Sequence, residues 1–196
     1  MTDPHAVWKD ANGDETYALE WEIDEESRVW EIGGYEGRWA SQIVAKYDPH
    51  VEIFEPQHGA YQKLIDRFRD FDKVGVYRFG LWVMECSLPL YHVGTDGASL
   101  VHAGSHSEAC EFRDVCNLVP GRVDLCLMNI EGGEYALLPY MIGYDLMKYF
   151  RLFWCQFHPG LVELGWGRYR AICEGMERTH RRMWEFYPTA VAWERR

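Results

Sequence analysis

The feature that most constrains this chain is a short apolar run that leads into a glycine-rich turn and then into a helical pattern. Residues 29–32 are mostly apolar, which is typical of a buried parallel strand. The turn Gly-Gly-Tyr-Glu-Gly at 33–37 follows, and Trp39 and Ile43 then fall on one face of a helix. A strand, a glycine turn and a helix bring backbone N–H groups close to a ligand at the start of the helix. The sequence therefore predicts a ligand site at this turn.

The spacing of the glycines argues against two common ligands of such turns. A dinucleotide-binding turn, G-x-G-x-x-G, would require glycine at Tyr35 and Arg38, and a P-loop would require G-K-S/T at Gly37. The remaining pattern, E-x-G-x-x-x-G, begins at Glu31, and the next strand ends in a second acid, Glu55. This pair suits S-adenosylmethionine, because one carboxylate can pair with its ammonium group and the other can accept its ribose hydroxyls. A turn with two incidental glutamates is the open alternative, since short glycine motifs often arise by chance.

Composition places the chain among globular proteins. Its 196 residues are 47% hydrophobic and 26% charged, which is enough for one domain with a core but hardly for two. No apolar run approaches the ~18 residues of a membrane helix, and the first residues lack the basic segment and apolar core of a signal peptide. The six cysteines form no C-x-x-C pair, so buried free thiols in a reducing cytoplasm are the simplest interpretation. We expect a cytoplasmic protein with no membrane partner and no metal site.

The net charge of −11 is unevenly distributed along the chain. Residues 1–26 hold nine acids and one lysine, so the remainder is close to neutral. A nearly neutral body with an acidic leader attracts phosphate backbones weakly, and nucleic acid is therefore not expected as a partner. Residues 1–27 are interpreted as an acidic leader that packs on the domain or closes over the site, and residues 28–196 as a single domain.

Strands and helices alternate through the first half of the chain. Beyond the first strand and helix, the apolar pattern predicts a strand at 51–55, a helix at 57–71 and a third strand at 73–79. This alternation is typical of a mostly parallel, doubly wound α/β sheet with helices on both faces. It then stops, and residues 81–100 read as two short strands and a loop, followed by a polar turn at 105–108.

A second strand-to-helix unit stands at the centre of the second half. Residues 123–129 form an apolar strand that leads into Asn129-Ile130-Glu131-Gly132-Gly133-Glu134, where a helix begins. Open α/β sheets bind ligands at the carboxyl ends of their strands, so these polar residues are candidates for the same site. The remaining elements predicted are a strand at 151–158, an arginine-bearing helix at 167–184 with a solvated face, and a strand at 189–193.

Several blocks along residues 28–160 together resemble the FkbM-type methyltransferases in order and spacing. The family's pattern is a D/E-x-G-x-x-x-G turn, a strand that ends F-E-P, and a K-x-D-x-E-G-x-E block. The blocks of this chain are Glu31-x-Gly33-x-x-x-Gly37, Ile53-Phe54-Glu55-Pro56, Ile130-Glu131-Gly132-Gly133-Glu134, Leu90-Tyr91 with Gly97-Ala98-Ser99-Leu100, and Gln156-Phe157-His158.

The resemblance implies a Rossmann-like class I methyltransferase fold with S-adenosylmethionine as cofactor. It also implies O-methylation of a small hydroxylated acceptor, such as a glycan sugar or a polyketide-like natural product, with the oligomeric state left open. The cofactor-binding residues it indicates are Glu31, Gly33, Gly34, Gly37, Glu55, Pro56 and Asn129. The catalytic candidates are His158, Glu131 and Glu134.

The chemistry asked of these candidates is modest. The acceptor hydroxyl must be aligned with the methyl group and must lose its proton, for which a neutral histidine such as His158 is suited near pH 7. A polar strand cap is the alternative for His158. For Glu131 and Glu134 the alternative is complementing a helix dipole.

The chain departs from the family pattern at two positions. Where the K-x-D block has lysine and aspartate, this chain has Leu127 and Asn129. Asparagine keeps the hydrogen-bonding shape of aspartate but loses its charge and basicity. A catalytically weak or inactive methyltransferase-like binding protein is therefore the alternative function.

Overall fold

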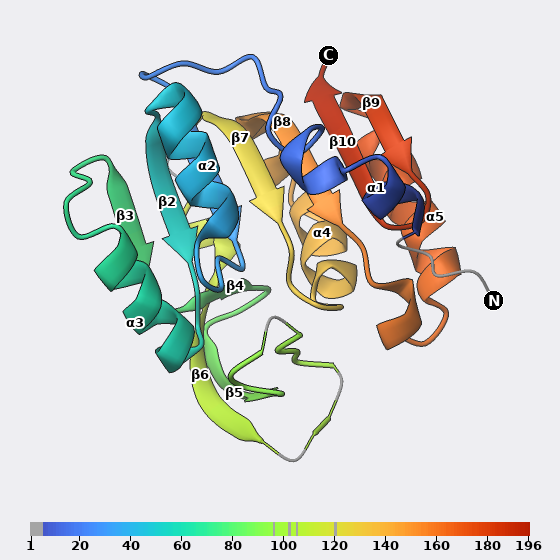
Figure 1. The fold of residues 1–196 in the computed structure, drawn as a ribbon. Helices are drawn as coiled ribbons and strands as arrows, with labels where there is room; N and C mark the ends of the chain where they lie inside the picture. Colours follow the sequence, from blue (N-terminus) through green and yellow to red (C-terminus); the bar gives the residue numbers. More distant parts are fainter. Residues whose placement is uncertain (1–5, 96, 102, 105, 120) are drawn as a thin grey trace.

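The computed structural model describes residues 6–95, 97–101, 103–104, 106–119 and 121–196. Its centre is a seven-stranded sheet in the order β3-β2-β1-β7-β8-β10-β9 (Figure 1). These strands are β1 (Arg28–Ile32), β2 (His50–Phe54), β3 (Val74–Tyr77), β7 (Val123–Met128), β8 (Phe150–Gln156), β9 (His180–Phe186) and β10 (Ala190–Arg195). Neighbouring strands are parallel, except that β10 runs antiparallel to both β8 and β9. The prediction of a mostly parallel, doubly wound sheet is confirmed.

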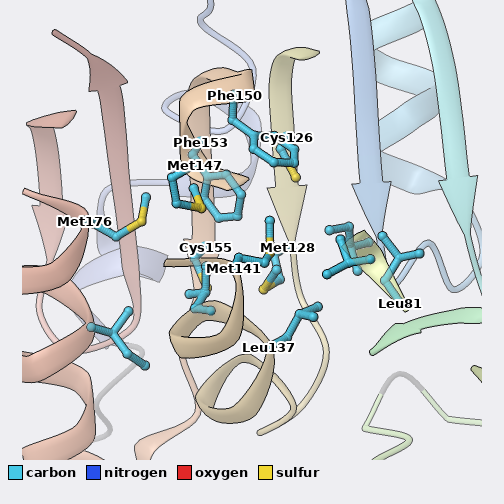
Figure 2. Packing of buried hydrophobic residues seen from close by; sticks show 14 of the residues in the cluster. Leu81, Cys126, Met128, Leu137, Met141, Met147, Phe150, Phe153, Cys155 and Met176 are labelled. Carbon is cyan, nitrogen blue, oxygen red and sulfur yellow. The ribbon is translucent and has the colours of Figure 1, made fainter. Parts of the chain in front are cut away.

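Helices cover both faces of this sheet, as predicted. The α-helices are α1 (Ala6–Asp10), α2 (Arg38–Tyr47), α3 (His58–Arg67), α4 (Glu134–Gly143) and α5 (Gly165–Met176), and the 3₁₀ turns are η1 (Gly13–Glu15), η2 (Val115–Asn117), η3 (Leu146–Tyr149) and η4 (Pro159–Leu161). One core contains residues of α1, α2 and α3, and the other contains residues of α4 and α5. Figure 2 shows Met128, Met141 and Cys155 packed in the second core, between β7, α4 and β8. None of the helices in the described ranges is long and apolar enough to cross a membrane.

A small second sheet lies beyond the carboxyl ends of β1 and β2 (Figure 1). It is three-stranded, in the order β4-β6-β5, and consists of β4 (Gly80–Trp82), β5 (Cys86–Tyr91) and β6 (Ser107–Asp114). The polar turn predicted at 105–108 is wrong, because Ser107 and Glu108 begin β6, and Ser105 lies outside the described residues. The alternation of buried Cys110 and Phe112 with exposed neighbours is the period-2 signal of this strand.

The end of the chain also differs from the prediction. Helix α5 ends at Met176, and the residues predicted as its last turns form strand β9 instead. Arg181 and Arg182 therefore stand on an edge strand, where Arg181 pairs with Glu194 of β10. The helix prediction failed because backbone pairing with β10, which the sequence does not show, overrides the local helical pattern.

The described part of the leader is folded against the domain. The Trp8 ring stacks on Trp154 and Trp184, with ring centroids 5.7 and 5.8 Å apart. The indole N–H groups of Trp21 and Trp39 both donate to the Ala18 carbonyl oxygen, at 2.8 and 2.7 Å. Residues 1–5 of the predicted leader lie outside the described residues, and the division into leader and domain stays a prediction.

Candidate cofactor site

A cavity of about 470 Å³ lies at the carboxyl ends of the central strands. The turn after β1 and the ends of β2 and β7 form one side, and the small sheet and the leader contribute further walls. Of the residues predicted to bind a cofactor or act in catalysis, the lining contains Glu31, Gly33, Gly34, Glu55, Pro56, Asn129 and Glu131. Gly37, Glu134 and His158 are not part of this lining. A cavity of this size suits a small-molecule ligand.

The glycines of the first turn are required by close packing. Gly33 has φ +88°, and a Cβ atom there would overlap the carbonyl oxygen of Asn129. The turn after β1 and the end of β7 therefore approach each other at a distance that only glycine permits. Gly37 has φ +73°, and a Cβ atom there would press on Leu64 at 2.6 Å and Phe68 at 2.7 Å. Gly37 thus fixes how α3 packs, and its predicted contact with a cofactor stays a prediction.

Glu55 is held rigidly at the end of β2. Its side chain is buried (5% exposed), and its two oxygens each accept a backbone N–H, from Gln57 and from Tyr35, at 2.8 Å. Burial raises the pKa of Glu55 to about 7, although the two amides act in the opposite direction. Each carboxylate oxygen keeps a further lone pair, so this group can accept two ligand hydroxyls.

Glu31 and Asn129 carry oxygens that nothing in the described part of the chain satisfies. Glu31 is 3% exposed, and its Oε2 has no hydrogen-bond partner among the described residues. The same holds for the Oδ1 of Asn129, whose backbone N–H donates to the Ile32 carbonyl oxygen at 3.0 Å. Burial, with repulsion from Glu55 in addition, raises the pKa of Glu31 well above its usual range. Buried polar atoms are rarely left without a partner, so both oxygens point to a ligand.

The three catalytic candidates form one cluster. The ring of His158 lies between two carboxylates, with Nε2 at 3.1 Å from Glu131 Oε1 and Nδ1 at 3.2 Å from Glu134 Oε1. Glu134 is fully buried and also accepts the backbone N–H groups of His158 and Gly132, at 2.7 and 2.8 Å. Of the three side chains, only Glu131 lines the cavity.

The expected neutral histidine needs correction. Burial alone would lower the pKa of His158, but hydrogen bonds to Glu131 and Glu134 outweigh it and raise the pKa to about 9. His158 therefore carries a proton at pH 7 and has no lone pair with which to remove another. Its position fits a residue that holds Glu131 in place.

Several residues that the sequence did not single out complete the site. Ser99 Oγ donates to the Glu131 carbonyl oxygen at 2.6 Å, which fixes the turn after β7 against the loop that follows β5. Gln57 Oε1 accepts the Gly94 N–H at 2.5 Å and ties the same loop to the end of β2. Trp154 lines the cavity, and its indole N–H is buried without a hydrogen-bond partner in the described residues. Ser99 stands in one of the resemblance blocks, whereas Gln57 and Trp154 gave no sequence signal.

The described residues contain no group of three or more histidine, cysteine or acidic side chains that could hold a metal ion. No protein-family model and no curated protein sequence matches the chain.

Solved structures do match it. A methyltransferase FkbM from Methylobacillus flagellatus has a TM-score of 0.59 at 14% identity, covering 88% of this chain and 44% of that one. The chain therefore spans less than half the length of that FkbM protein. A fibrillarin/Nop5p complex matches with a TM-score of 0.59 at 10% identity, covering 97% of this chain and 83% of the other. An rRNA methylase from Streptococcus thermophilus has a TM-score of 0.53 at 12% identity, covering 100% and 98%.

These matches correct one expectation. The absence of nucleic acid among the partners was predicted from charge, and rRNA methylases are among the structures that share this fold. The prediction is wrong because a net charge averages over the whole surface and does not describe the face that meets an acceptor. The resemblance to FkbM-type enzymes, in contrast, is confirmed at the level of the fold. With its strand order, its cavity and these matches, the chain has the class I methyltransferase fold.

Proposed function

We propose that this protein binds S-adenosylmethionine in the cavity at the carboxyl ends of β1, β2 and β7, and transfers its methyl group to a hydroxyl of an acceptor. The fold and the shape of the cavity support this function. The observation that carries it is the Glu55 carboxylate, which two backbone amides hold at the end of β2 with its remaining lone pairs available. Such a carboxylate suits the paired hydroxyls of a ribose.

The polar groups of the cavity also disfavour phosphate ligands. Glu31 lines the cavity next to the glycine turn, where a pyrophosphate would lie in a dinucleotide site, and a carboxylate repels phosphate. The unpartnered oxygens of Glu31 and Asn129 are acceptors for an ammonium group, and both residues line the cavity. A nucleoside that carries an amino acid fits this set of groups.

The bound cofactor supplies an activated methyl group on its sulfonium, so the protein has to align the acceptor and manage one proton. We assign the proton to Glu131, whose carboxylate lines the cavity. The His158 ring fixes one oxygen of Glu131, and Glu134 fixes His158 in turn.

Turnover assays with candidate acceptors identify the acceptor class. The matched rRNA methylases make ribosomal RNA one arm of the assay, and the resemblance to FkbM-type enzymes makes hydroxylated small molecules, including sugars and polyketide-like compounds, the other. Cofactor binding without turnover on any acceptor would favour the alternative, a weak or inactive binding protein, to which Leu127 and Asn129 point. A cytoplasmic location, expected from the cysteine content, stays a prediction.

Calorimetric titration tests the cofactor assignment. S-adenosylmethionine is expected to bind and NAD is not, and Glu55→Gln should weaken cofactor binding by about 1.5–3 kcal/mol, the worth of hydrogen bonds to a charged group. Glu52→Gln is the matched control, because Glu52 stands on the same strand but contacts Arg28 and Trp30 and does not line the cavity. Equal affinity of the Glu55 variant and the parent would remove Glu55 from the site.

A further inference from the structure

The part of the cavity beside the leader is lined by side chains that donate hydrogen bonds. Arg38 and Gln42 stand one turn apart on α2, and Trp154 belongs to β8. Ala18 of the leader lines the cavity as well, and its carbonyl oxygen already accepts the indole N–H of Trp39 at 2.7 Å. The ring centroids of Trp39 and Trp154 are 6.3 Å apart, so the donors of α2 and β8 face the same end of the cavity.

The indole N–H of Trp154 is a buried donor that lacks an acceptor. Trp154 is 4% exposed, and its Nε1 has no hydrogen-bond partner in the described ranges of the chain. In the sheet Trp154 stands in one row with Glu31, with Leu127 between them, so the three side chains lie on the same face. Glu31 Oε2 is an acceptor that likewise has no partner there. A ligand that carries an ammonium group next to an anionic oxygen would satisfy both groups.

The leader already places a carboxylate on the other two donors. Glu15 of η1 is outside the lining, but its Oε1 accepts a hydrogen bond from Arg38 Nη2 and its Oε2 accepts one from Gln42 Nε2 at 2.7 Å. Arg38 is the one cation that the described residues contribute to the cavity, and 73% of its side chain is exposed, so it can turn from Glu15 to a ligand. Asp14 also lines the cavity, and its repulsion of a ligand carboxylate makes that positive charge necessary.

We propose that this end of the cavity is a subsite for the carboxylate of S-adenosylmethionine, and that Glu15 of the leader competes with the ligand for it. The inference rests on the proposed function. With the ammonium group on Glu31, the α-carboxylate is attached to the same carbon atom and needs donors of its own. The Trp154 N–H donates to one of its oxygens, and Arg38 supplies the compensating charge when it leaves Glu15. Cofactor binding and the contact of Glu15 with α2 therefore oppose each other.

The test compares two ligands that differ only in this carboxylate. Decarboxylated S-adenosylmethionine keeps the adenosine, the sulfonium and the amine but lacks the α-carboxylate. In calorimetric titrations of the full chain we expect it to bind about tenfold more weakly than S-adenosylmethionine, a ratio that one hydrogen bond to a charged group supplies.

Removal of the competing carboxylate tests the part played by the leader. Glu15→Ala should tighten the binding of S-adenosylmethionine about threefold and leave that of the decarboxylated ligand unchanged, because only a ligand with a carboxylate uses Arg38. Glu20→Ala is the matched control. Glu20 is a leader acid that pairs with Lys46 of α2 at 2.6 Å, and neither residue lines the cavity, so this variant should change neither affinity.

Two further substitutions remove the proposed donors. Trp154→Phe keeps an aromatic ring but lacks the N–H, and Arg38→Gln lacks the charge, so each should reduce the affinity ratio of the two ligands about threefold. Trp193→Phe is the control for Trp154, because Trp193 also has a buried Nε1 without a partner in the described residues but does not line the cavity. Melting temperatures show whether Trp154→Phe folds, and the exposed Glu15 and Arg38 carry the test if it does not.

The outcomes distinguish the inference from the function on which it rests. Equal affinities for S-adenosylmethionine and its decarboxylated form would overturn the carboxylate subsite while cofactor binding stands. An affinity for S-adenosylmethionine that Glu15→Ala leaves unchanged would overturn the competition by the leader. If neither ligand binds, the proposed function fails and the inference falls with it.

Discussion

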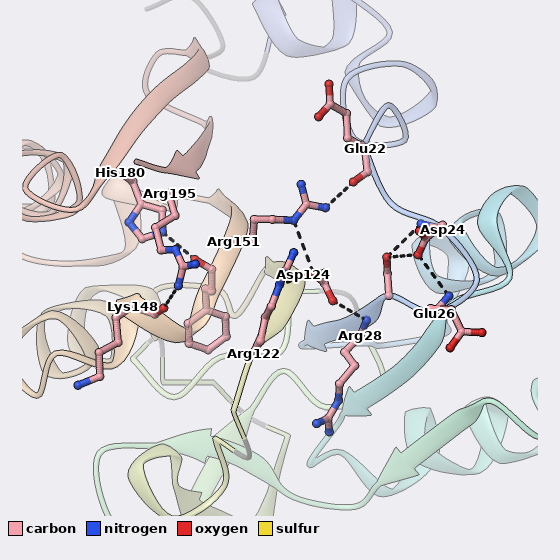
Figure 3. A network of polar contacts seen from close by, with 12 residues as sticks. Glu22, Asp24, Glu26, Arg28, Arg122, Asp124, Lys148, Arg151, His180 and Arg195 are labelled. Carbon is pink, nitrogen blue, oxygen red and sulfur yellow. Dashed lines mark hydrogen bonds and ion pairs between the residues drawn. The ribbon is translucent and has the colours of Figure 1, made fainter.

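At the amino end of the central sheet the carboxylate of Asp124 is fully satisfied, whereas at the carboxyl end that of Glu31 is not. Asp124 pairs with Arg122 at 2.8 Å and with Arg151 at 3.5 Å, and accepts the backbone N–H of Arg28 at 3.1 Å (Figure 3). Arg151 also donates to the Glu22 carbonyl oxygen, so the network ties the leader to the sheet. Glu31 is more deeply buried than Asp124, yet its Oε2 has no partner among the described residues.

The difference separates structural polar groups from functional ones. A carboxylate surrounded by its own cations stabilises the fold and has nothing left to offer a ligand. A buried carboxylate without a cation destabilises the fold when it is ionised, and a ligand cation can relieve that cost. Changes at the amino end should therefore affect stability alone, and changes at the carboxyl end should affect binding.

The largest effect is expected from a substitution in the glycine turn at the carboxyl end of β1. Gly33→Val places a branched side chain against the carbonyl oxygen of Asn129 in a backbone conformation with φ +88°, which valine rarely adopts. We expect loss of cofactor binding and a fall in the free energy of unfolding of about 3 kcal/mol or more. Chemical denaturation and calorimetry measure the two effects. Gly59→Ala is the control, because a Cβ atom there meets nothing within 4 Å, and normal binding by the Gly33 variant would contradict the close approach.

His158 lies at the carboxyl end of the sheet, but like Asp124 it has charged partners, because both of its ring nitrogens contact carboxylates. Its pKa is raised from 6.5 to about 9, so its contribution to stability is complete below pH 6.5 and is lost as the pH rises through 9. We expect His158→Gln to reduce the free energy of unfolding by about 2–3 kcal/mol at pH 6 and by clearly less at pH 10. Denaturant unfolding at several pH values gives this profile.

His180 is the matched control for that profile. It is buried, its Nε2 lies 3.0 Å from the Phe150 carbonyl oxygen, and burial lowers its pKa. Its pH dependence therefore has the opposite sign, with stability lost as the pH falls below 6.5. If His158→Gln and His180→Gln changed the free energy of unfolding with the same pH trend, the pairing of His158 with Glu131 and Glu134 would be refuted.

A pair of isosteric changes compares the two ends directly. Asp124→Asn should lower the free energy of unfolding by about 1–2 kcal/mol, because it removes the charge from partly exposed ion pairs, and should leave cofactor affinity unchanged. Glu31→Gln should weaken cofactor binding and raise the free energy of unfolding. The raised pKa of Glu31 means that the parent loses stability as the pH rises above 4.5, so the variant should be more stable by about 1–3 kcal/mol at pH 8.

Unfolding curves at pH 5 and pH 8 with cofactor titrations of both variants decide this comparison. The gain in stability of Glu31→Gln should shrink at pH 5, where the acid of the parent is largely neutral. A destabilised Glu31 variant with unchanged affinity would mean that Glu31 is a structural group like Asp124.

The sequence predicted the strands and the parallel character of the sheet better than it predicted the protonation of the site residues. The apolar strands and the glycine turn are local patterns, so they suffice to place Glu31 and Glu55 at strand ends. Strand β9 was missed because pairing with β10 determines it. The charge of His158 was missed for a similar reason, since the two carboxylates that raise its pKa are brought to it by the turn after β7, far from it in sequence. Long-range neighbours set both properties, and no local pattern contains them.

The smallest effect is expected from substitutions that restore the lysine and the aspartate of the family pattern at Leu127 and Asn129. Leu127→Lys places an ammonium group beside Glu31 in register, which should lower the pKa of Glu31. Asn129→Asp alone adds a carboxylate to the cavity that Glu31 also lines, and like-charge repulsion should raise that pKa further. If the two new groups share one electrostatic network, the double variant should be more stable than the sum of the single effects by about 0.5–1 kcal/mol. Leu127→Met controls for the packing of the buried side chain, and unfolding measurements of all four proteins complete the cycle. Strictly additive effects would mean that Leu127 and Asn129 act independently.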